Sequence, residues 1–206
     1  VGSEMCIRDR ASAVTAWLTT GADLVTAVER AEDYATLALE GSFAPGSGAR
    51  VADRTAATFH DAEKWRVYSN CVRALQILEA AANGYKLIPE VSSNIAYALP
   101  DARTTEEVCS VPGRIHRVGN SVRPSGAPVF GGGSHVARAV LAMMSHDRSL
   151  RAGINIRYGE DVLAACRELN YRVAGFDRTA EPPEIAAEES KTIPWGIEQA
   201  LSLIHI

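Results

Sequence analysis

A glycine-rich turn near the middle of the chain has the composition of an anion-binding site. The segment PVFGGGSHVARAVLAMM (128–144) starts with a short apolar stretch, passes through Gly131–Gly133, and then changes to helical spacing of apolar residues. Ser134 is a suitable N-cap for that helix. A glycine loop leading into a helix points free backbone N–H groups and the positive end of the helix dipole at one place, where a phosphate or carboxylate can bind. His135, in the first helical turn, adds a side chain that can donate a hydrogen bond or a proton.

This glycine turn is not a P-loop, because no Gly-Lys-Ser or Gly-Lys-Thr follows the glycines. A plain turn between a loop and a helix has the same residue pattern. From this segment alone, both the anion site and the plain turn stay open.

Several other polar residues are expected at strand or loop ends, where the sites of α/β proteins gather. Arg114 starts one alternating segment, Asn155 and Arg157 lie in a second, and the pair Asp177-Arg178 ends a third. Arginine is well suited to binding phosphate oxygens with its planar guanidinium. Each of these residues also has a plainer explanation, as a strand start, a local ion pair or a helix cap. Together with the glycine turn, they favour an oxyanion or pyrophosphate pocket.

The overall composition is that of an ordinary globular protein. The 206 residues are 47% hydrophobic and 22% charged, with a formal net charge of −4, which argues against a nucleic-acid surface. No apolar run approaches the roughly 20 residues that span a bilayer. The cysteines lack metal-site spacing and predict a reduced, cytoplasmic protein; they are Cys6, Cys71, Cys109 and Cys166. Three histidines are interpreted as surface residues: His60, His116 and His146.

The chain divides into two parts joined by a linker. Residues 11–43 predict two helices, the second capped by Asp23, and residues 44–60 are a linker rich in small and polar residues. The two ends, 1–10 and 201–206, fit no periodicity of their neighbours and resemble translated sequencing adapter, so we set them aside. A helix-turn-helix in the first part is disfavoured, because its second helix is acidic where a DNA reader needs basic or amide side chains.

Residues 61–200 predict one α/β domain. A long amphipathic helix (61–83) comes first, and Thr104 with Glu107 forms a capping box for a short helix. Turns at Gly119-Asn120 and Ser125-Gly126 predict hairpins, which would place Val122 and Val129 on neighbouring antiparallel strands. The remaining expected elements are strands within 87–99, 114–118, 153–158 and 171–178, and helices at 134–146, 160–169 and after Pro182-Pro183.

Six segments then establish a resemblance to a known family. LIPEVSSNIAYALPDA, VPGRIHRVG, FGGGSHVARAVLAMM, INIRYGEDVLAAC, VAGFDRTAEP and PWGIE occur in the order found in ThiN-type thiamine-phosphate synthase domains of archaeal type. Residues 11–43 resemble the last helices of a hydroxymethylpyrimidine (phosphate) kinase of ribokinase-like fold. The whole resembles the back end of a fused kinase–synthase, without the glycine-rich catalytic turn of the kinase, so no kinase activity is expected.

The resemblance implies a three-layer α/β/α domain with a mixed, mostly antiparallel sheet. It implies a transferase that joins hydroxymethylpyrimidine diphosphate to hydroxyethylthiazole phosphate, giving thiamine monophosphate and pyrophosphate. The characteristic Arg and His of the family fall on Arg114 and His135. Related domains in transcription regulators, which sense thiamine phosphate without turnover, tend to lack this pair and the leading helix. A sensing domain is therefore the alternative.

The expected chemistry needs preorganised positive charge and N–H donors at a departing pyrophosphate, more than it needs a strong base. We assign Arg114 to the diphosphate and His135, with the amides of Gly131, Gly132, Gly133 and Ser134, to the leaving oxygens. Mg²⁺ is expected to bridge the phosphates, with its protein ligands unknown and Asp177 a candidate. Further candidate contacts are Asn155, Arg157 or Arg178 for the thiazole phosphate, and Ser93 and Asn94 for the pyrimidine or a phosphate. The expected partners are the two small-molecule substrates, without nucleic acid or membrane, and the sequence leaves the oligomeric state open, a homo-oligomer included.

Overall fold

The computed structural model describes residues 3–202. These residues form two compact units, with the boundary between Glu63 and Lys64. In the first unit, α1 (Ser3–Thr19) and α2 (Leu24–Glu40) pack against each other through the small side chains Ala27, Ala31, Ala35 and Ala38 of α2. The Asp23 side chain accepts hydrogen bonds from the amides of Val25 and Thr26, which confirms the predicted cap. α1 includes most of the segment 1–10 that we had set aside, while 203–206 lie outside the described residues.

A long helix leads into the second unit. α3 (Ala56–Ala80) starts in the first unit and continues into the second, so the predicted helix 61–83 is confirmed with an earlier start. Val67, Cys71, Leu75 and Leu78 recur at intervals of three and four residues, and all four are buried. These side chains belong to the hydrophobic core of the second unit.

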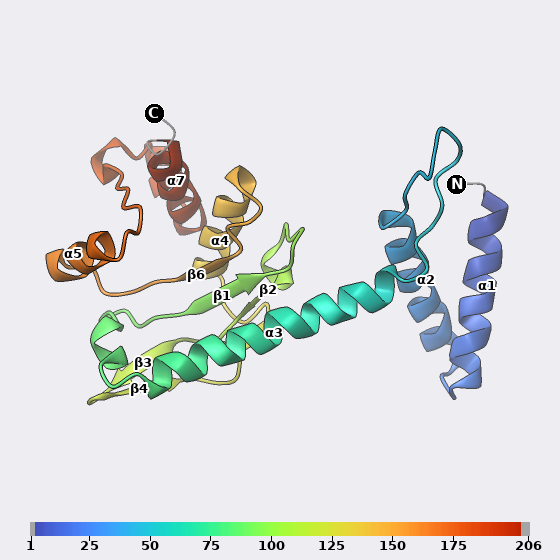
Figure 1. Ribbon diagram of the computed structural model, residues 1–206, viewed down its shortest axis with the longest axis horizontal. Helices are drawn as coiled ribbons and strands as arrows, with labels where there is room; N and C mark the ends of the chain where they lie inside the picture. The colour runs from blue at the N-terminus through green and yellow to red at the C-terminus, as the bar shows by residue number, and fades with distance from the viewer. Residues whose placement is uncertain (1–2, 203–206) are drawn as a thin grey trace. The chain divides into compact units, whose positions relative to one another are not determined.

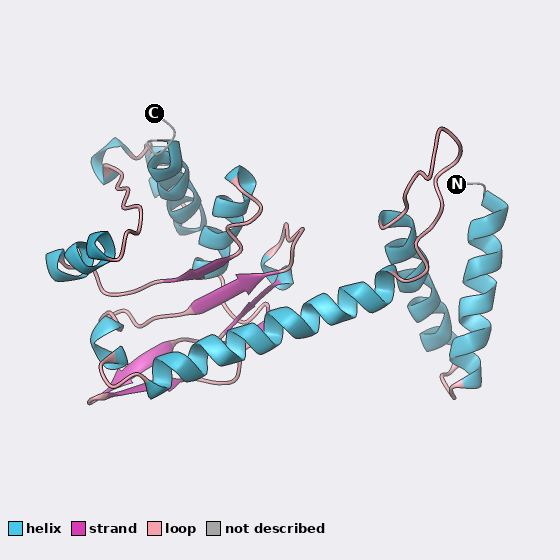
Figure 2. Cartoon of the chain, viewed as in Figure 1, coloured by secondary structure: helices cyan, strands magenta, loops and turns pink. Residues whose placement is uncertain are grey.

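The centre of the second unit is a four-stranded sheet, in the order β5-β2-β1-β6 (Figures 1 and 2). Its strands are β1 (Ile95–Ala98), β2 (Val108–Ser110), β5 (Val129–Phe130) and β6 (Ala152–Ile154). A separate hairpin pairs β3 (Ile115–Val118) with β4 (Ser121–Pro124). All pairings among the described residues are antiparallel, so the parallel component of a mixed sheet does not occur there.

Helices cover both faces of the four-stranded sheet, as expected for an α/β/α domain. Figure 1 shows α3 on one side and α4 (His135–His146) on the other. Ala96, Ser110 and Gly153 lie in register across the sheet, and a Cβ at Gly153 would contact Val140 of α4 at 3.0 Å, so this row faces α4. Helix α7 (Glu189–Ser202) packs against α4 from outside.

The remaining elements are short. They are η1 (Gly84–Leu87), η2 (Thr105–Glu107), α5 (Glu160–Glu168), η3 (Arg178–Ala180) and α6 (Pro183–Ala186). The capping box of Thr104 and Glu107 is present, as predicted.

Two predicted strand features are wrong. Val122 lies in the β3–β4 hairpin, whereas Val129 pairs with Ser110 of β2, so the two valines are not on neighbouring strands. Residues 171–178 form no strand, because Phe176 instead packs edge-on against Trp195 of α7, with ring centroids 5.8 Å apart. The ring occupies the space beside Gly196, where a Cβ would lie 2.6 Å from it.

Candidate active site

One cavity of about 820 Å³ in the second unit contains both Arg114 and His135. The polar part of its lining comes from three loops, at Ser92–Asn94, at Gly113-Arg114 and at Gly131–His135, together with Asn155. The apolar part comes from α4, α7 and the sheet, with Val136, Ala139, Met143, Gly153, Ile154, Ile193 and Ile197, and from Val91. The cavity lining therefore combines hydrogen-bond donors and the Arg114 guanidinium with apolar side chains.

The glycine loop lies directly against the edge of the sheet. Gly131 has a positive φ of 72°, and a Cβ at Gly132 would lie 2.4 Å from the carbonyl oxygen of Ser110. Ser134 occupies the N-cap position of α4 but makes no capping hydrogen bond with its side chain, unlike the predicted arrangement. The start of a twelve-residue helix thus faces a cavity with its amides uncapped by Ser134, which suits an anion.

Arg114 is held by contacts at both ends of the residue. Its guanidinium Nη1 donates to the carbonyl oxygen of Val91 at 2.5 Å, and its backbone amide donates to Ser125 Oγ at 3.3 Å. The guanidinium stays exposed and has several further N–H groups, so it can still bind an anion.

His116, interpreted from the sequence as a surface residue, supports the loops that carry Arg114. It is exposed, but its Nδ1 lies 2.9 Å from Ser92 Oγ and its Nε2 lies 2.9 Å from Ser125 Oγ. Ser125 also accepts from the Arg114 amide, and Ser92 is held at a positive φ of 69°. The alternation of residues 114–118 could not reveal this link, since both partners lie far from His116 in the chain.

Ser93, Asn94 and Asn155 line the cavity, but they are largely engaged with the protein itself. Ser93 Oγ donates to the carbonyl oxygen of Asn155, and Asn155 Oδ1 accepts from the Asn94 amide at 2.7 Å. Asn155 Nδ2 donates to the carbonyl oxygen of Ser92 at 3.0 Å. These three residues join the start of β1 to the chain after β6, and so form the floor of the cavity.

Three of the predicted site residues do not line this cavity. Arg157 pairs with Asp161 at 2.5 Å, and this hydrogen bond raises the pKa of Arg157. The Arg157 Nε donates to the carbonyl oxygen of Lys86. Asp177 caps η3 and accepts from the Thr179 hydroxyl and amide, and these bonds lower its pKa. Arg178 lies 3.5 Å from Glu181. The sequence placed all three at strand ends, but β6 ends at Ile154 and the segment 171–178 is not a strand.

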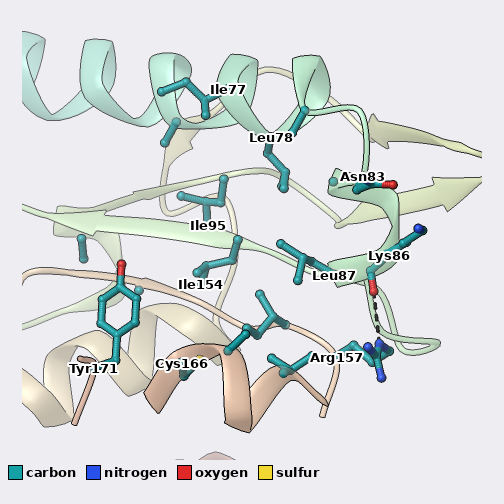
Figure 3. Close-up of a pocket in the computed structure, with 18 of the residues that line it drawn as sticks. Ile77, Leu78, Asn83, Lys86, Leu87, Ile95, Ile154, Arg157, Cys166 and Tyr171 are labelled. Atoms are coloured by element: carbon teal, nitrogen blue, oxygen red, sulfur yellow. Dashed lines mark hydrogen bonds between the residues drawn. The ribbon is translucent and has the colours of Figure 1, made fainter. Parts of the chain in front are cut away.

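A second cavity, of about 1160 Å³, lies on the α3 side of the sheet and is mostly apolar (Figure 3). Ile77, Leu78, Ile95 and Ile154 point into it, and Arg157 sits at its rim beside the carbonyl oxygen of Lys86. Neither Arg114 nor His135 lines it. The cavity that contains both Arg114 and His135 is therefore the candidate active site.

A family profile matches most of the second unit. Residues 71–204 match the profile of the family described as thiamine-phosphate synthase ThiN. The chain belongs to the ThiN family. The matched region contains all the residues that line the candidate active site, together with the second part of α3, from Cys71 to Ala80. Its relatives place this ThiN chain in thiamine biosynthesis.

Two curated relatives and one solved structure illustrate the match. The chain is 36% identical over 132 residues to thiamine-phosphate synthase ThiN of Methanothermobacter thermautotrophicus, covering 64% of this chain and 70% of the relative. It is 29% identical over 191 residues to the bifunctional thiamine biosynthesis protein ThiDN of Methanocaldococcus jannaschii, covering 92% of this chain but 42% of that protein. The crystal structure of the C-terminal domain of phosphomethylpyrimidine kinase superposes with a TM-score of 0.63 at 43% identity, covering 68% of this chain and 79% of that one.

No helix in the described part of the chain is both long and apolar enough to cross a membrane. Among the same residues, no group of three or more His, Cys, Asp or Glu side chains is placed to hold a metal ion.

Proposed function

We propose that this ThiN domain joins hydroxymethylpyrimidine diphosphate to hydroxyethylthiazole phosphate, producing thiamine monophosphate and pyrophosphate. The observation that carries the proposal is that Arg114, His135 and the glycine loop line one cavity. Their positions in the sequence had suggested a shared anion site, and the geometry supports it.

The cavity suits the charge that develops in this reaction. The bond between the pyrimidine methylene carbon and the diphosphate oxygen breaks, and the thiazole nitrogen forms the new bond to that carbon. Negative charge accumulates on the departing oxygens, where the Arg114 guanidinium, the His135 imidazole and the amides of residues 131–134 can stabilise it. His135 is suited to hydrogen-bonding or protonating the leaving oxygen.

The apolar side of the cavity suits the two aromatic rings. Val136 and Met143 of α4 and Ile193 and Ile197 of α7 line the same cavity. Apolar side chains in a cavity exclude water and can hold aromatic rings in place, which is the positioning that a two-substrate reaction needs. No residue here must act as a strong nucleophile.

Magnesium is the expected cofactor, but the cavity offers it no carboxylate. The lining contains amide, hydroxyl and cationic groups and no Asp or Glu among the described residues, and Asp177 lies outside it. Mg²⁺ would enter bound to diphosphate oxygens and water, neutralising charge on the leaving group. The described residues that line this cavity do not by themselves make a magnesium site.

We also propose that residues 11–43 derive from a kinase domain of a fused protein, as in the ThiDN relative that aligns over most of this chain. The sequence of residues 11–43 does not include the glycine-rich catalytic turn of the kinase family that it resembles, so we expect no phosphorylation of the pyrimidine by this chain.

The test is to supply both substrates and Mg²⁺ and to measure pyrophosphate and thiamine monophosphate. Release of the two products in equal amounts, dependent on both substrates, supports the synthase. Tight binding of thiamine monophosphate without turnover would instead indicate a sensing domain. Omitting the thiazole phosphate is the control, since pyrophosphate release without it would be hydrolysis.

A further inference from the structure

The side chain of Asn94 is buried and has its hydrogen-bonding capacity fully used by the protein. Asn94 is 8% exposed, and its Oδ1 accepts from the amides of Ile95 at 2.8 Å and Val111 at 3.0 Å. Its Nδ2 donates to the carbonyl oxygens of Val111 at 2.8 Å and Gly113 at 3.3 Å. Two acceptor and two donor contacts exhaust what a carboxamide can make, so Asn94 is not available to bind a substrate without losing one of them.

These contacts connect the two halves of the candidate active site. Gly113 immediately precedes Arg114, and the hydrogen bonds to Val111 and Gly113 hold that turn against the start of β1. On its other side, Asn94 supports the glycine loop, since a Cβ at Gly133 would lie 2.7 Å from Asn94 Nδ2. One carboxamide therefore sits between the turn that carries Arg114 and the loop that leads to His135.

We propose that Asn94 is a positioning residue that sets the distance between the Arg114 turn and the glycine loop. The inference rests on the proposed synthase reaction, in which both groups act on one pyrophosphate. A displacement of either group by about 1 Å costs on the order of 100-fold in rate when two groups must act together. Asn94 itself touches no reacting atom.

The proposed role of residue 94 requires an asparagine side chain as well as its position. An aspartate could keep both contacts of Oδ1, but its second oxygen would face the carbonyl oxygens of Val111 and Gly113. Two acceptors cannot pair without a proton between them, and burial beside carbonyl oxygens raises the pKa of a carboxyl. The carboxyl introduced by N94D would therefore regain one donor contact only at low pH, when it is protonated.

This gives a pH-dependent test of Asn94. We compare the kcat of N94D with that of the wild type from pH 5 to pH 8, each expressed as a ratio at the same pH. The kcat of N94D divided by the kcat of the wild type should be about 1:100 at pH 8 and should rise by about 10-fold towards pH 5. The KM values should change much less. The matched control is Asn83→Asp, since Asn83 makes no capping hydrogen bond and lines only the other cavity; its ratio should stay near one throughout.

A structural role alone would give a different result. N94D would then melt at a lower temperature, but well below that temperature its kcat would equal that of the wild type at every pH, which overturns the proposal. Should N94D fail to fold, Asn94→Ser replaces it: this neutral side chain is too short to reach both Val111 and Gly113, so the loss in kcat should persist without recovery at low pH. An Asn94→Ser protein with the wild-type kcat would equally overturn the proposal.

The outcome is separable from that of the proposed function. If the wild-type chain shows no synthase activity, the synthase proposal fails, and calorimetry with inorganic pyrophosphate and Mg²⁺ still tests Asn94. N94D should bind pyrophosphate at least about 10-fold more weakly than Asn83→Asp at pH 8, and equal affinities would contradict the positioning role.

Discussion

Arg114 and His135 come from different elements, a turn before β3 and the first turn of α4, and line the same cavity. Between them lies the glycine loop, which packs on β2 without room for side chains. An arginine, a histidine and a row of amides in one concave site form an arrangement that stabilises a departing anion.

The first prediction concerns these two side chains. If the proposed reaction is correct, Arg114→Ala and His135→Ala should each lower kcat by about 10²–10³-fold, because each removes a group that would stabilise the charge on the leaving pyrophosphate. Steady-state assays of pyrophosphate release measure the loss. Arg123→Ala and His146→Ala, which change exposed residues outside the cavity, are the controls, and a similar loss in these would mean that the effect is not local.

The second prediction concerns the glycine loop. Gly133→Ala should lower kcat by about 100-fold, since its Cβ would lie 2.7 Å from Asn94 Nδ2 and 3.3 Å from Ser110 Oγ, and the loop must move away. Gly46→Ala is a matched control in the linker, where a Cβ meets nothing within 4 Å. Unchanged activity in Gly133→Ala would show that the position of the loop does not matter to the reaction.

The third prediction concerns Arg157 and Arg178, which the sequence suggested as ligands of the thiazole phosphate. Both lie outside the cavity and pair with acids, so Arg157→Gln and Arg178→Gln should leave KM for the thiazole phosphate within about twofold of the wild type. A large rise in KM for either variant would mean that the arginine does bind the thiazole phosphate. The assay varies thiazole phosphate at a saturating concentration of the pyrimidine diphosphate.

The fourth prediction concerns acid stability. The hydrogen bond from Arg157 holds the pKa of Asp161 below its usual value of 3.8. Because the pKa is lower in the folded state, this stabilisation is complete above the usual value and is lost as pH falls through the folded pKa. Thermal melts should therefore show Asp161→Asn melting below the wild type at pH 7, with the difference shrinking towards pH 3. A difference that is constant with pH would mean that the carboxylate charge is not its cause.

The local patterns of the sequence predicted most helices and the composition of the site. The spacing of Val67, Cys71, Leu75 and Leu78 predicted α3, and the glycine turn predicted the loop before α4. These features depend on neighbours along the chain, where propensity and periodicity act directly. The convergence of Arg114 and His135 was an expectation from their residue types and places beside the glycine turn, and from the family resemblance; whether they share a cavity could be seen only in the folded chain.

The errors arose where distant contacts decide the structure. The alternating residues 171–178 look like a strand, but the ring of Phe176 packs on Trp195, and no neighbouring strand pairs with the segment. Val129 pairs with β2 and not with the nearer β4, a choice of partner that hairpin turn signals cannot reveal. The sequence analysis did not predict that Ile193 and Ile197 line the cavity. Their four-residue spacing, which places them on one face of a helix, was the available signal.

The contribution of α7 to the cavity wall has a consequence for biosynthesis on the ribosome. Arg114, His135 and the glycine loop are all translated well before Ile193 and Ile197, which line the same cavity. A nascent chain that has emerged only as far as α5 can present Arg114 and His135 to solvent, but it lacks the part of the cavity wall that α7 supplies. That part of the wall should therefore form late in synthesis, when α7 docks on α4.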